Sequence, residues 1–263
     1  MIFAVKNDGK NNIFNFDSMI IKTGLMGTMG NKGSCLVRFQ CLDTTYAFAC
    51  SHLAAGSGAN SSRISEIIEI LNKNYPVHKR KTFKEHDLYF IFGDLNFRCD
   101  IDYSTCINLI NEKKLEILLD CDQLTKSRKN VYLNELDEGK IKFNPTYKYV
   151  IGTSEYDSKA KRVPSWCDRI LFKKSEFLTQ TCYDRAEMTI SDHKPIYSIF
   201  KTYAIKELKE EKAKIIKEIK ANMILGVKSS QVFEDKNDTD SLNRFYEKSE
   251  RKSGDNNIFD YFK

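Results

Sequence analysis

A carboxylate and a carboxamide stand two residues apart, just behind an apolar run of this 263-residue sequence. Residues 88–91 are aromatic and branched apolar residues, and they predict a buried strand. Gly93 breaks that strand, and Asp94 and Asn96 follow it. Residues i and i+2 of an extended chain point the same way, so this pair would face one pocket, orient a water molecule and hold a phosphoryl oxygen. The alternative is an ordinary turn, which Gly, Asp and Asn commonly form.

Two histidines and a second carboxylate also stand at the ends of apolar runs. His52 follows residues 46–50, where it could donate a hydrogen bond to a phosphate oxygen or have a structural role alone. Asp168 and Arg169 open another strand, as site residues or as a surface ion pair, and His193 precedes the last strand. A carboxylate fixes the tautomer of a neighbouring imidazole and supports its charged form, so Asp168 and His193 are predicted to pair.

A glycine-rich segment at residues 23–33 is a further candidate for binding. It lacks the residue order of a Walker-type phosphate loop, and no helix pattern follows it. Leu25, Met26 and Met29 stand between the glycines, and Lys32 lies beside them. This composition suits a loop that dips into a lipid surface, whereas the spacing alone favours a flexible hairpin.

The elements that must position these residues are short strands with helices between them. Strands are predicted at residues 2–5, 13–16, 19–22, 34–40, 45–51, 88–92, 168–172 and 196–200. Helices are predicted at residues 62–72, where apolar residues recur at helical spacing, and within residues 103–119. Strands with helices on the outside predict a two-sheet α/β sandwich.

The composition changes after about residue 201. Residues 204–225 carry an apolar stripe with Glu and Lys on the other face, which predicts a helix. A packing helix or short coiled coil is favoured over a membrane-surface helix, because the polar face carries both signs of charge. The polar residues beyond it are predicted to be mobile.

Charge and cysteine content narrow the class of protein only slightly. The net charge of +6 mildly favours contact with phosphates or an anionic membrane surface. The eight cysteines form no CxxC pair and no zinc-site spacing, which predicts reduced thiols in a cytosolic protein. No stretch reaches the ~20 apolar residues of a membrane span. Residues 1–6 lack the features of a signal peptide and are typical of the middle of a strand, which predicts a missing upstream segment.

Six segments in order resemble the inositol-polyphosphate 5-phosphatases, above all the lipid-acting type II enzymes. They are TGLMGTMGNKG, SHL, GDLNFR, NPTYKY, RVPSWCDRIL and SDHKP, and the resemblance runs to about Phe200. It implies the four-layer α/β sandwich of the endonuclease/exonuclease/phosphatase superfamily, with two packed mixed β-sheets flanked by helices and a Mg²⁺ site at one rim. The expected divisions are an N-terminally truncated catalytic domain at 1–201, a charged amphipathic helix at 202–226 and a polar tail at 227–263.

The resemblance also implies roles for single residues. Asp94 matches the residue that activates the attacking water, and Asn96 one that holds water and phosphate. His52 and His193 match phosphate-contacting histidines, with His193 oriented by Asp168. Asp192 matches the acidic neighbour of the metal. Contacts to the substrate and its 4-phosphate are implied for Tyr147, Lys148, Lys161 (or Lys159), Arg162, Lys32 and Arg169. Contacts to lipid chains are implied for Leu25, Met26 and Met29.

The sequence departs from the family at its start. The family's upstream strands carry an Asn and a Glu, the Glu being the main Mg²⁺ ligand, and no Glu of this chain takes that place. Three hypotheses follow: a fragment of a 5-phosphatase, an inactive domain that binds phosphoinositide or protein, or another superfamily enzyme such as a nuclease or sphingomyelinase.

Expected partners are a phosphoinositide lipid or a soluble inositol polyphosphate, a peripheral membrane contact and a protein partner for the C-terminal helix. Nucleic acid is not expected as a partner. The expected location is the cytoplasm, at the cytosolic face of membranes.

Overall fold

The computed structural model describes residues 1–2, 4, 12–24, 29–77, 81–129 and 133–224. The chain divides into two units, with the boundary between residues 204 and 205. The first unit contains every predicted site residue.

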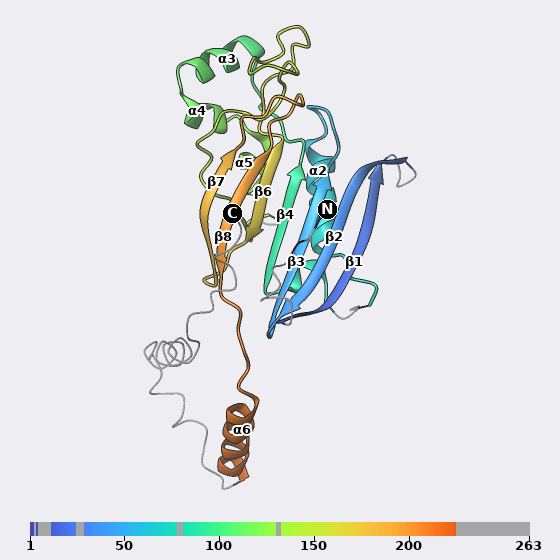
Figure 1. Ribbon diagram of the computed structural model, residues 1–263, viewed down its shortest axis with the longest axis vertical. Coiled ribbons are helices and arrows are strands. Elements are labelled where there is room, and N and C mark those ends of the chain that lie inside the picture. The colour runs from blue at the N-terminus through green and yellow to red at the C-terminus, as the bar shows by residue number, and fades with distance from the viewer. Residues whose placement is uncertain (3, 5–11, 25–28, 78–80, 130–132, 225–263) are drawn as a thin grey trace. The chain divides into compact units, whose positions relative to one another are not determined.

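The first unit is built on a six-stranded sheet (Figure 1). Its strands, in spatial order, are β1 (Ile13–Gly24), β2 (Met29–Cys41), β3 (Thr44–His52), β4 (Leu88–Asp94), β6 (Asp168–Lys173) and β5 (Leu136–Asp137). The pair β3–β4 is parallel and the other neighbours are antiparallel, so the sheet is mixed. A parallel pair brings the carboxyl ends of two strands to one edge, which is the edge where the site lies.

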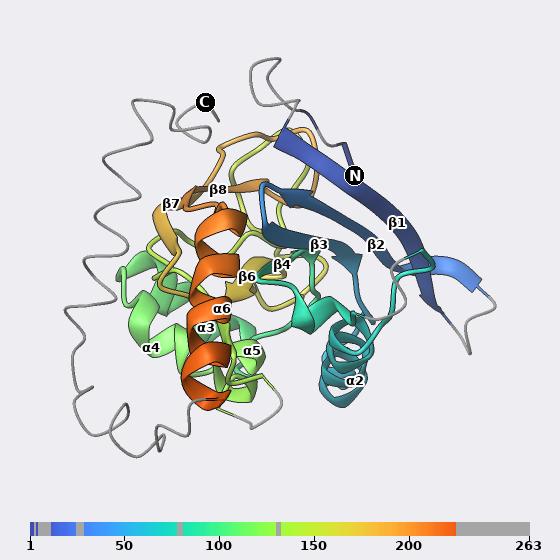
Figure 2. The same cartoon turned by 90° about the horizontal axis from the view of Figure 1, so that it is seen from below.

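Helices cover one face of this sheet, and a second sheet packs on the other. Helix α2 (Asn60–Leu71) buries Ile67 and Ile70 in a core that includes Ala49 and Ile91 from the strands. On the other face lies the antiparallel pair β7 (Leu178–Arg185) and β8 (Ile196–Thr202), whose arrangement can be followed in Figure 2. The ring of Phe200 in β8 lies 5.1 Å from that of Phe90 in β4 and 5.1 Å from that of Phe172 in β6. The predicted α/β sandwich is therefore confirmed, with a second sheet of two antiparallel strands in the described residues.

Short helices fill the connection between β4 and β6. They are α3 (Tyr103–Asn111), α4 (Leu115–Leu119) and α5 (Gln123–Ser127), whereas the 3₁₀ helix η2 (Phe83–Glu85) precedes β4. Asp102 caps α3 and Asp122 caps α5, each by accepting a hydrogen bond from a backbone N–H of the first turn. Helices α3 and α4 contribute Cys106, Ile110 and Leu118 to a second core that includes the buried Trp166.

Some predicted elements differ from the structure. The strand expected at residues 2–5 is not found at Ile2 or Ala4, and residues 3 and 5 lie outside the described part. The strands expected at 13–16 and 19–22 are one strand, β1, interrupted by a bulge beside Asn15, whose φ is 54°. Strand β7 was missed because its sequence, LTQTCYDR, alternates weakly between apolar and polar residues.

In the second unit, α6 (Lys209–Ile224) confirms the predicted helix and begins five residues later than expected. Its stripe residues Ile215, Ile216 and Ile219 are exposed. Among the described helices, none has the length and apolar character needed to cross a membrane. All eight cysteines of the chain are free thiols.

Candidate active site

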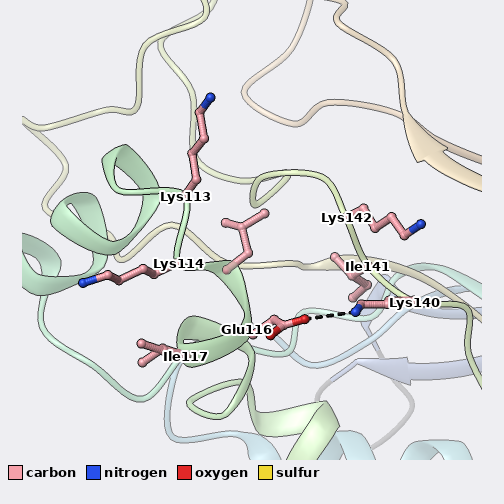
Figure 3. A pocket seen from close by; sticks show the side chains of 8 residues that line it. Lys113, Lys114, Glu116, Ile117, Lys140, Ile141 and Lys142 are labelled. Atoms are coloured by element: carbon pink, nitrogen blue, oxygen red, sulfur yellow. Dashed lines mark hydrogen bonds and ion pairs between the residues drawn. The ribbon is translucent and has the colours of Figure 1, made fainter.

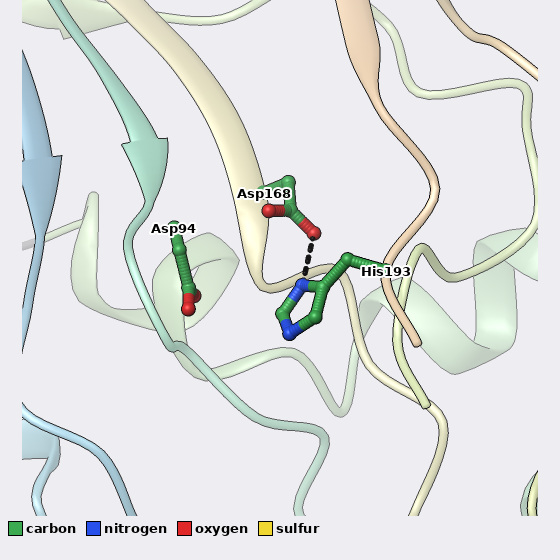
Figure 4. A group of neighbouring side chains, drawn as sticks. All are labelled: Asp94, Asp168 and His193. Atoms are coloured by element: carbon green, nitrogen blue, oxygen red, sulfur yellow. Dashed lines mark hydrogen bonds and ion pairs between the residues drawn. The ribbon is translucent and has the colours of Figure 1, made fainter. Parts of the chain in front are cut away.

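Three of the predicted residues are neighbours across three strands. In the register of the sheet, His52 at the end of β3 pairs with Asp94 at the end of β4. Asp94 in turn pairs with Asp168 at the start of β6. His193 reaches the same edge from the loop before β8, and Figure 4 shows how its ring meets Asp168 and how Asp94 lies beside them. Residues from four distant parts of the sequence thus meet at one sheet edge.

The segment after β4 is a turn as well as part of the site. Gly93 has a φ of 120°, and a Cβ there would lie 2.3 Å from the carbonyl oxygen of Ser51, so only glycine fits. Asn96 has a φ of 57°, a left-handed conformation that Asn tolerates. Its backbone N–H donates to Asp94 Oδ1 at 3.1 Å and its Nδ2 donates to Asp94 Oδ2 at 3.2 Å. The turn is therefore what sets the two side chains against each other.

Asn96 is buried, and both polar atoms of its side chain form hydrogen bonds with protein groups. Its Nδ2 also donates to the carbonyl oxygen of Leu53 at 3.0 Å, and its Oδ1 accepts from the guanidinium of Arg98. Its side chain thus positions Asp94, in addition to any contact with water or phosphate.

His193 is held by a chain of hydrogen bonds. Its Nδ1 lies 2.9 Å from Asp168 Oδ2, so the predicted pairing is present. The hydroxyl of Thr146 donates to the same oxygen at 2.6 Å, and the ring of Tyr147 lies 4.6 Å from the imidazole. Burial alone would lower the pKa of His193, but the hydrogen bond and charge of Asp168, helped by Asp94, outweigh burial and raise it. The ring is therefore stabilised in its charged form.

Asp94 lies in a crowded and partly buried position. Burial, followed by the negative charge of Asp168, raises the pKa of Asp94 above its usual range. His52 Nε2 lies 3.2 Å from Asp94 Oδ2, and the ammonium of Lys32 contacts the same imidazole nitrogen. Burial lowers the pKa of His52, and Lys32 adds to this effect while Asp94 opposes it. A carboxylate with a raised pKa is a better proton acceptor, which suits the activation of water.

The donor set at this edge fits a hard divalent cation. Among the described residues, Asp94, Asp168 and His193 offer ligand atoms that all lie within 4.8 Å of one another. Two carboxylates supply the oxygen ligands that Mg²⁺ prefers, and such ions take their remaining ligands from water and substrate phosphates. Asp192 was predicted at the metal, but its carboxylate accepts a hydrogen bond from Lys148 Nζ at 2.9 Å instead and is not in this group.

The predicted substrate-contacting residues differ in how near they lie to the two site histidines. Tyr147 and Lys148 stand beside His193, and Lys32 stands beside His52. Lys161 and Arg162 are exposed on the loop that returns to Ser165, whose backbone pairs with Tyr147. Of the predicted lipid-contacting residues, Leu25 and Met26 lie outside the described residues, and Met29 opens β2.

The prediction that Arg169 contacts substrate is wrong. Its side chain is fully buried and binds Asp122 Oδ2 at 2.8 Å and Glu138 Oε2 at 2.6 Å. These two carboxylates bind the guanidinium inside the protein. Consecutive side chains of a strand point to opposite faces, so Arg169 lies on the side of β6 opposite to Asp168. Arg169 therefore has a structural role.

Two residues of the site were not assigned a role from the sequence. Thr146 supports Asp168, and Arg98 contacts Asn96 while its guanidinium lies 4.5 Å from the centre of the Tyr147 ring. Both belong to the recognised segments NPTYKY and GDLNFR, so their presence in those segments was the available signal.

A groove elsewhere on the surface does not share these residues (Figure 3). It is lined by Lys113, Lys114, Leu115, Glu116, Ile117, Lys140, Ile141 and Lys142. Lys140 Nζ donates to Glu116 Oε1 at 3.0 Å across it, and the labelled Lys113, Lys114 and Lys142 point in different directions. The lysines do not converge on one point.

Comparison with known proteins places the chain in a family. The model for endonuclease/exonuclease/phosphatase family 2 matches residues 1–199. A type IV inositol polyphosphate 5-phosphatase of Arabidopsis thaliana is 40% identical over 194 residues, which cover 68% of this chain and 46% of that protein. A polyphosphatidylinositol phosphatase of Saccharomyces cerevisiae is 36% identical over 206 residues, which cover 76% of this chain and 18% of that protein. The chain thus spans less than half the length of these relatives.

A solved structure gives the same result. The inositol polyphosphate 5-phosphatase domain of SPsynaptojanin, in complex with inositol (1,4)-bisphosphate and a calcium ion, matches with a TM-score of 0.76 and 32% identity. The match covers 85% of this chain and 65% of that one. A Cimex nitrophorin, at 20% identity and a TM-score of 0.55, shares the fold alone. The chain therefore belongs to endonuclease/exonuclease/phosphatase family 2, and its relatives there include the inositol polyphosphate 5-phosphatases.

Proposed function

We propose that this chain carries a metal-dependent phosphomonoesterase site that removes the 5-phosphate from phosphoinositides, such as phosphatidylinositol 4,5-bisphosphate or 3,4,5-trisphosphate. The observation that carries the proposal is the convergence of Asp94, Asp168 and His193 within 4.8 Å at one sheet edge. The sequence similarity to 5-phosphatases supports the same conclusion.

The residues divide the chemistry between them. Asp94, held by the N–H and Nδ2 of Asn96, is placed to take a proton from the attacking water. His193 is held through Nδ1 by Asp168, and its Nε2–H donates a hydrogen bond to an oxygen of the scissile phosphate. Asn96 and Thr146 are positioning residues that fix Asp94 and Asp168.

A divalent cation such as Mg²⁺, held by Asp94 and Asp168, would neutralise charge on the phosphate when bound. The protein itself supplies mainly positioning and charge stabilisation, as in other phosphoryl transfers.

Substrate selection rests on groups beside the core site. Tyr147 and Lys148 stand next to His193 and suit a second phosphate of the ring, and the exposed Arg162 can add a bidentate contact. Lys148 must leave Asp192 to do so, because the two form an ion pair at 2.9 Å. We also propose a peripheral contact with the cytosolic face of membranes, because the proposed substrate is a lipid.

A second candidate is an inactive domain that binds inositides. The group of metal-ligating side chains found among the described residues contains two Asp and one His but no Glu. Such a site would bind inositol phosphates without releasing phosphate.

Phosphate release separates the candidates. The chain is incubated with phosphatidylinositol 4,5-bisphosphate or inositol 1,4,5-trisphosphate, with Mg²⁺ and with EDTA. We expect release that requires Mg²⁺ and is lost in Asp168→Asn but retained in Asp137→Asn, a substitution outside the site. Binding of both inositides without release would favour the inactive domain, and faster cleavage of abasic DNA than of inositides would contradict both.

A further inference from the structure

Four large apolar side chains are exposed together beside the site. They are Val150, Ile151, Met188 and Ile190, which we call the apolar tip, and the exposed fractions of Ile151 and Ile190 are 66% and 77%. Exposed apolar side chains that stand singly need no explanation, whereas a group of them on adjoining loops marks an interaction surface.

The tip stands on two backbone segments, residues 148–152 and 188–192, which we call the arms and which are hydrogen-bonded to each other. The N–H of Gly152 donates to the carbonyl oxygen of Thr189 at 2.7 Å, which sets Ile151 beside the 188–190 segment. Nearer the site, the N–H of Tyr149 donates to the carbonyl oxygen of Asp192 at 2.9 Å. The arms therefore form one projection.

The base of this projection is the site itself. The backbones of Tyr147 and His193 pair with each other where the arms begin. The tip residues follow three to five residues further along the arms, which at ~3.3 Å per residue is at most roughly 10–17 Å from the site.

The first arm is an ordered turn that presents Ile151. The backbones of Tyr149 and Tyr156 pair, and the N–H of Val150 donates to the carbonyl oxygen of Glu155 at 2.9 Å. Gly152, with a φ of 84°, lets the chain reverse. Ile151 is thus held outward by a defined backbone rather than by its own packing.

Basic side chains flank the base of the projection. Lys159, Lys161 and Arg162 are exposed on the stretch that returns from the turn to Ser165. The exposed acidic residues of the projection are Glu155 on the turn and Glu187 beside Met188, and Glu187 is neutralised by ion pairs with Arg185 and Lys194. The order from the outside inward is apolar, then basic, then the site, which matches the order from acyl chains to phosphate head groups in an anionic bilayer.

We propose that the apolar tip inserts into the interfacial layer of an anionic phospholipid bilayer while the site at its base engages a head group. This inference rests on the proposed function in one respect, that the substrate is a lipid. A bilayer is favoured over a protein partner because the tip has only aliphatic and Met side chains, whereas protein-binding hot spots are rich in Trp, Tyr and Arg.

The first test measures binding to vesicles by co-sedimentation. The vesicles contain phosphatidylcholine alone or with about one-fifth phosphatidylserine, a lipid that carries the negative surface charge. The variant Ile151→Asp/Ile190→Asp is expected to bind the anionic vesicles at least roughly tenfold more weakly than the unchanged chain, because it loses two apolar side chains that the bilayer would bury.

Val77→Asp is the matched control. Val77 is 74% exposed, and its N–H bonds to Asp17, which pairs with Arg38. Val77 is therefore remote from the site. Arg38 lies five residues along β2 from Gly33, the register partner of His52, which is roughly 17 Å from the site edge. This variant should bind vesicles like the unchanged chain, and circular dichroism should show that all variants are folded.

A second test detects insertion directly. The chain's single Trp, Trp166, is fully buried, so its emission should not respond to vesicles. Tryptophan placed by Ile151→Trp should shift its emission to the blue when anionic vesicles are added, and tryptophan placed by Val77→Trp should not.

Each outcome bears on the proposal in one direction. Tip-dependent vesicle binding together with the blue shift supports it, even if phosphate release from soluble inositol 1,4,5-trisphosphate is absent, a result that would count against the proposed function alone. Absence of vesicle binding by the unchanged chain, or equal binding by the double variant, would overturn it and leave a protein as the partner for the tip.

Discussion

Asp94 and Asp168 face each other as register partners on the antiparallel strands β4 and β6. Like charges directly opposite on neighbouring strands are destabilising, and in this pair they contribute to the raised pKa of Asp94. His193 offsets part of the repulsion by binding Asp168. A bound cation would offset more of it, so the same arrangement that costs stability provides the ligands for a metal.

Thr146→Val should lower turnover without preventing folding. The substitution keeps the volume of this buried side chain but removes the 2.6 Å hydrogen bond to Asp168. Asp168 then orients His193 less well, and kcat should fall about tenfold with a smaller change in KM. The lost bond should lower the free energy of unfolding by about 1 kcal/mol.

Thr146→Ser is the matched control, because it keeps the hydroxyl. It should retain kcat within about threefold. If Thr146→Val and Thr146→Ser have equal turnover, the hydroxyl does not position Asp168.

Arg169→Met should destabilise the fold strongly. The change leaves Asp122 buried without its cation and Glu138 with only the longer, 3.5 Å pair to Arg128, which is expected to lower the free energy of unfolding by about 3–5 kcal/mol. Arg162→Met, at an exposed position, should change it by less than about 0.5 kcal/mol. Urea denaturation monitored by the fluorescence of Trp166 measures both, and wild-type stability of Arg169→Met would show that the buried ion cluster has no structural role.

His86 should make the fold sensitive to acid. Its Nε2 accepts from Arg38 Nε at 3.0 Å, and its Nδ1 lies 3.1 Å from the carbonyl oxygens of Thr82 and Phe83, which fits a neutral ring. Burial, with a smaller effect from Arg38, lowers the pKa of His86 from 6.5 to about 4. Tyr75 packs on the ring, and the Lys173 ammonium binds the His86 carbonyl, so no acid among these neighbours would stabilise the charged form.

The sign of the effect follows from this depressed pKa. Between pH 6.5 and pH 4 the unfolded chain binds the proton that the folded chain excludes, so stability is lost as the pH falls. The loss is about 3 kcal/mol across this interval, at about 1.4 kcal/mol per pH unit. Urea denaturation at several pH values should show a shallower slope for His86→Asn, and an unchanged slope would contradict the assignment to His86.

The sequence predicted which residues end the strands but not how the strands align. Polar residues that follow an apolar run identified His52 and Asp94, and one that precedes a run identified Asp168, because burial of a strand dictates its composition. Their adjacency depends on the register of β3, β4 and β6, which is set by long-range packing that no local pattern encodes.

Two errors concern the direction of side chains. Arg169 follows Asp168 in a strand, where consecutive side chains point to opposite faces, so this alternation could have removed it from the site. Asn96 was expected on an extended chain, but β4 ends at Asp94 and Asn96 adopts a left-handed conformation. The intrinsic turn tendency of Gly and Asn decided the backbone there, and the turn itself brought the two side chains together.

Asp94→Asn tests the central claim most directly. The substitution keeps the size of the side chain and can keep the contact with Asn96, but it removes the base that activates water. Release of phosphate from inositol 1,4,5-trisphosphate in Mg²⁺ and calorimetric binding of the same compound are measured in the unchanged chain and in the variant. We predict Mg²⁺-dependent release by the unchanged chain and a loss of at least about 100-fold in the variant, with binding of the compound weakened much less than its turnover. Equal turnover of the two proteins would contradict this role for Asp94.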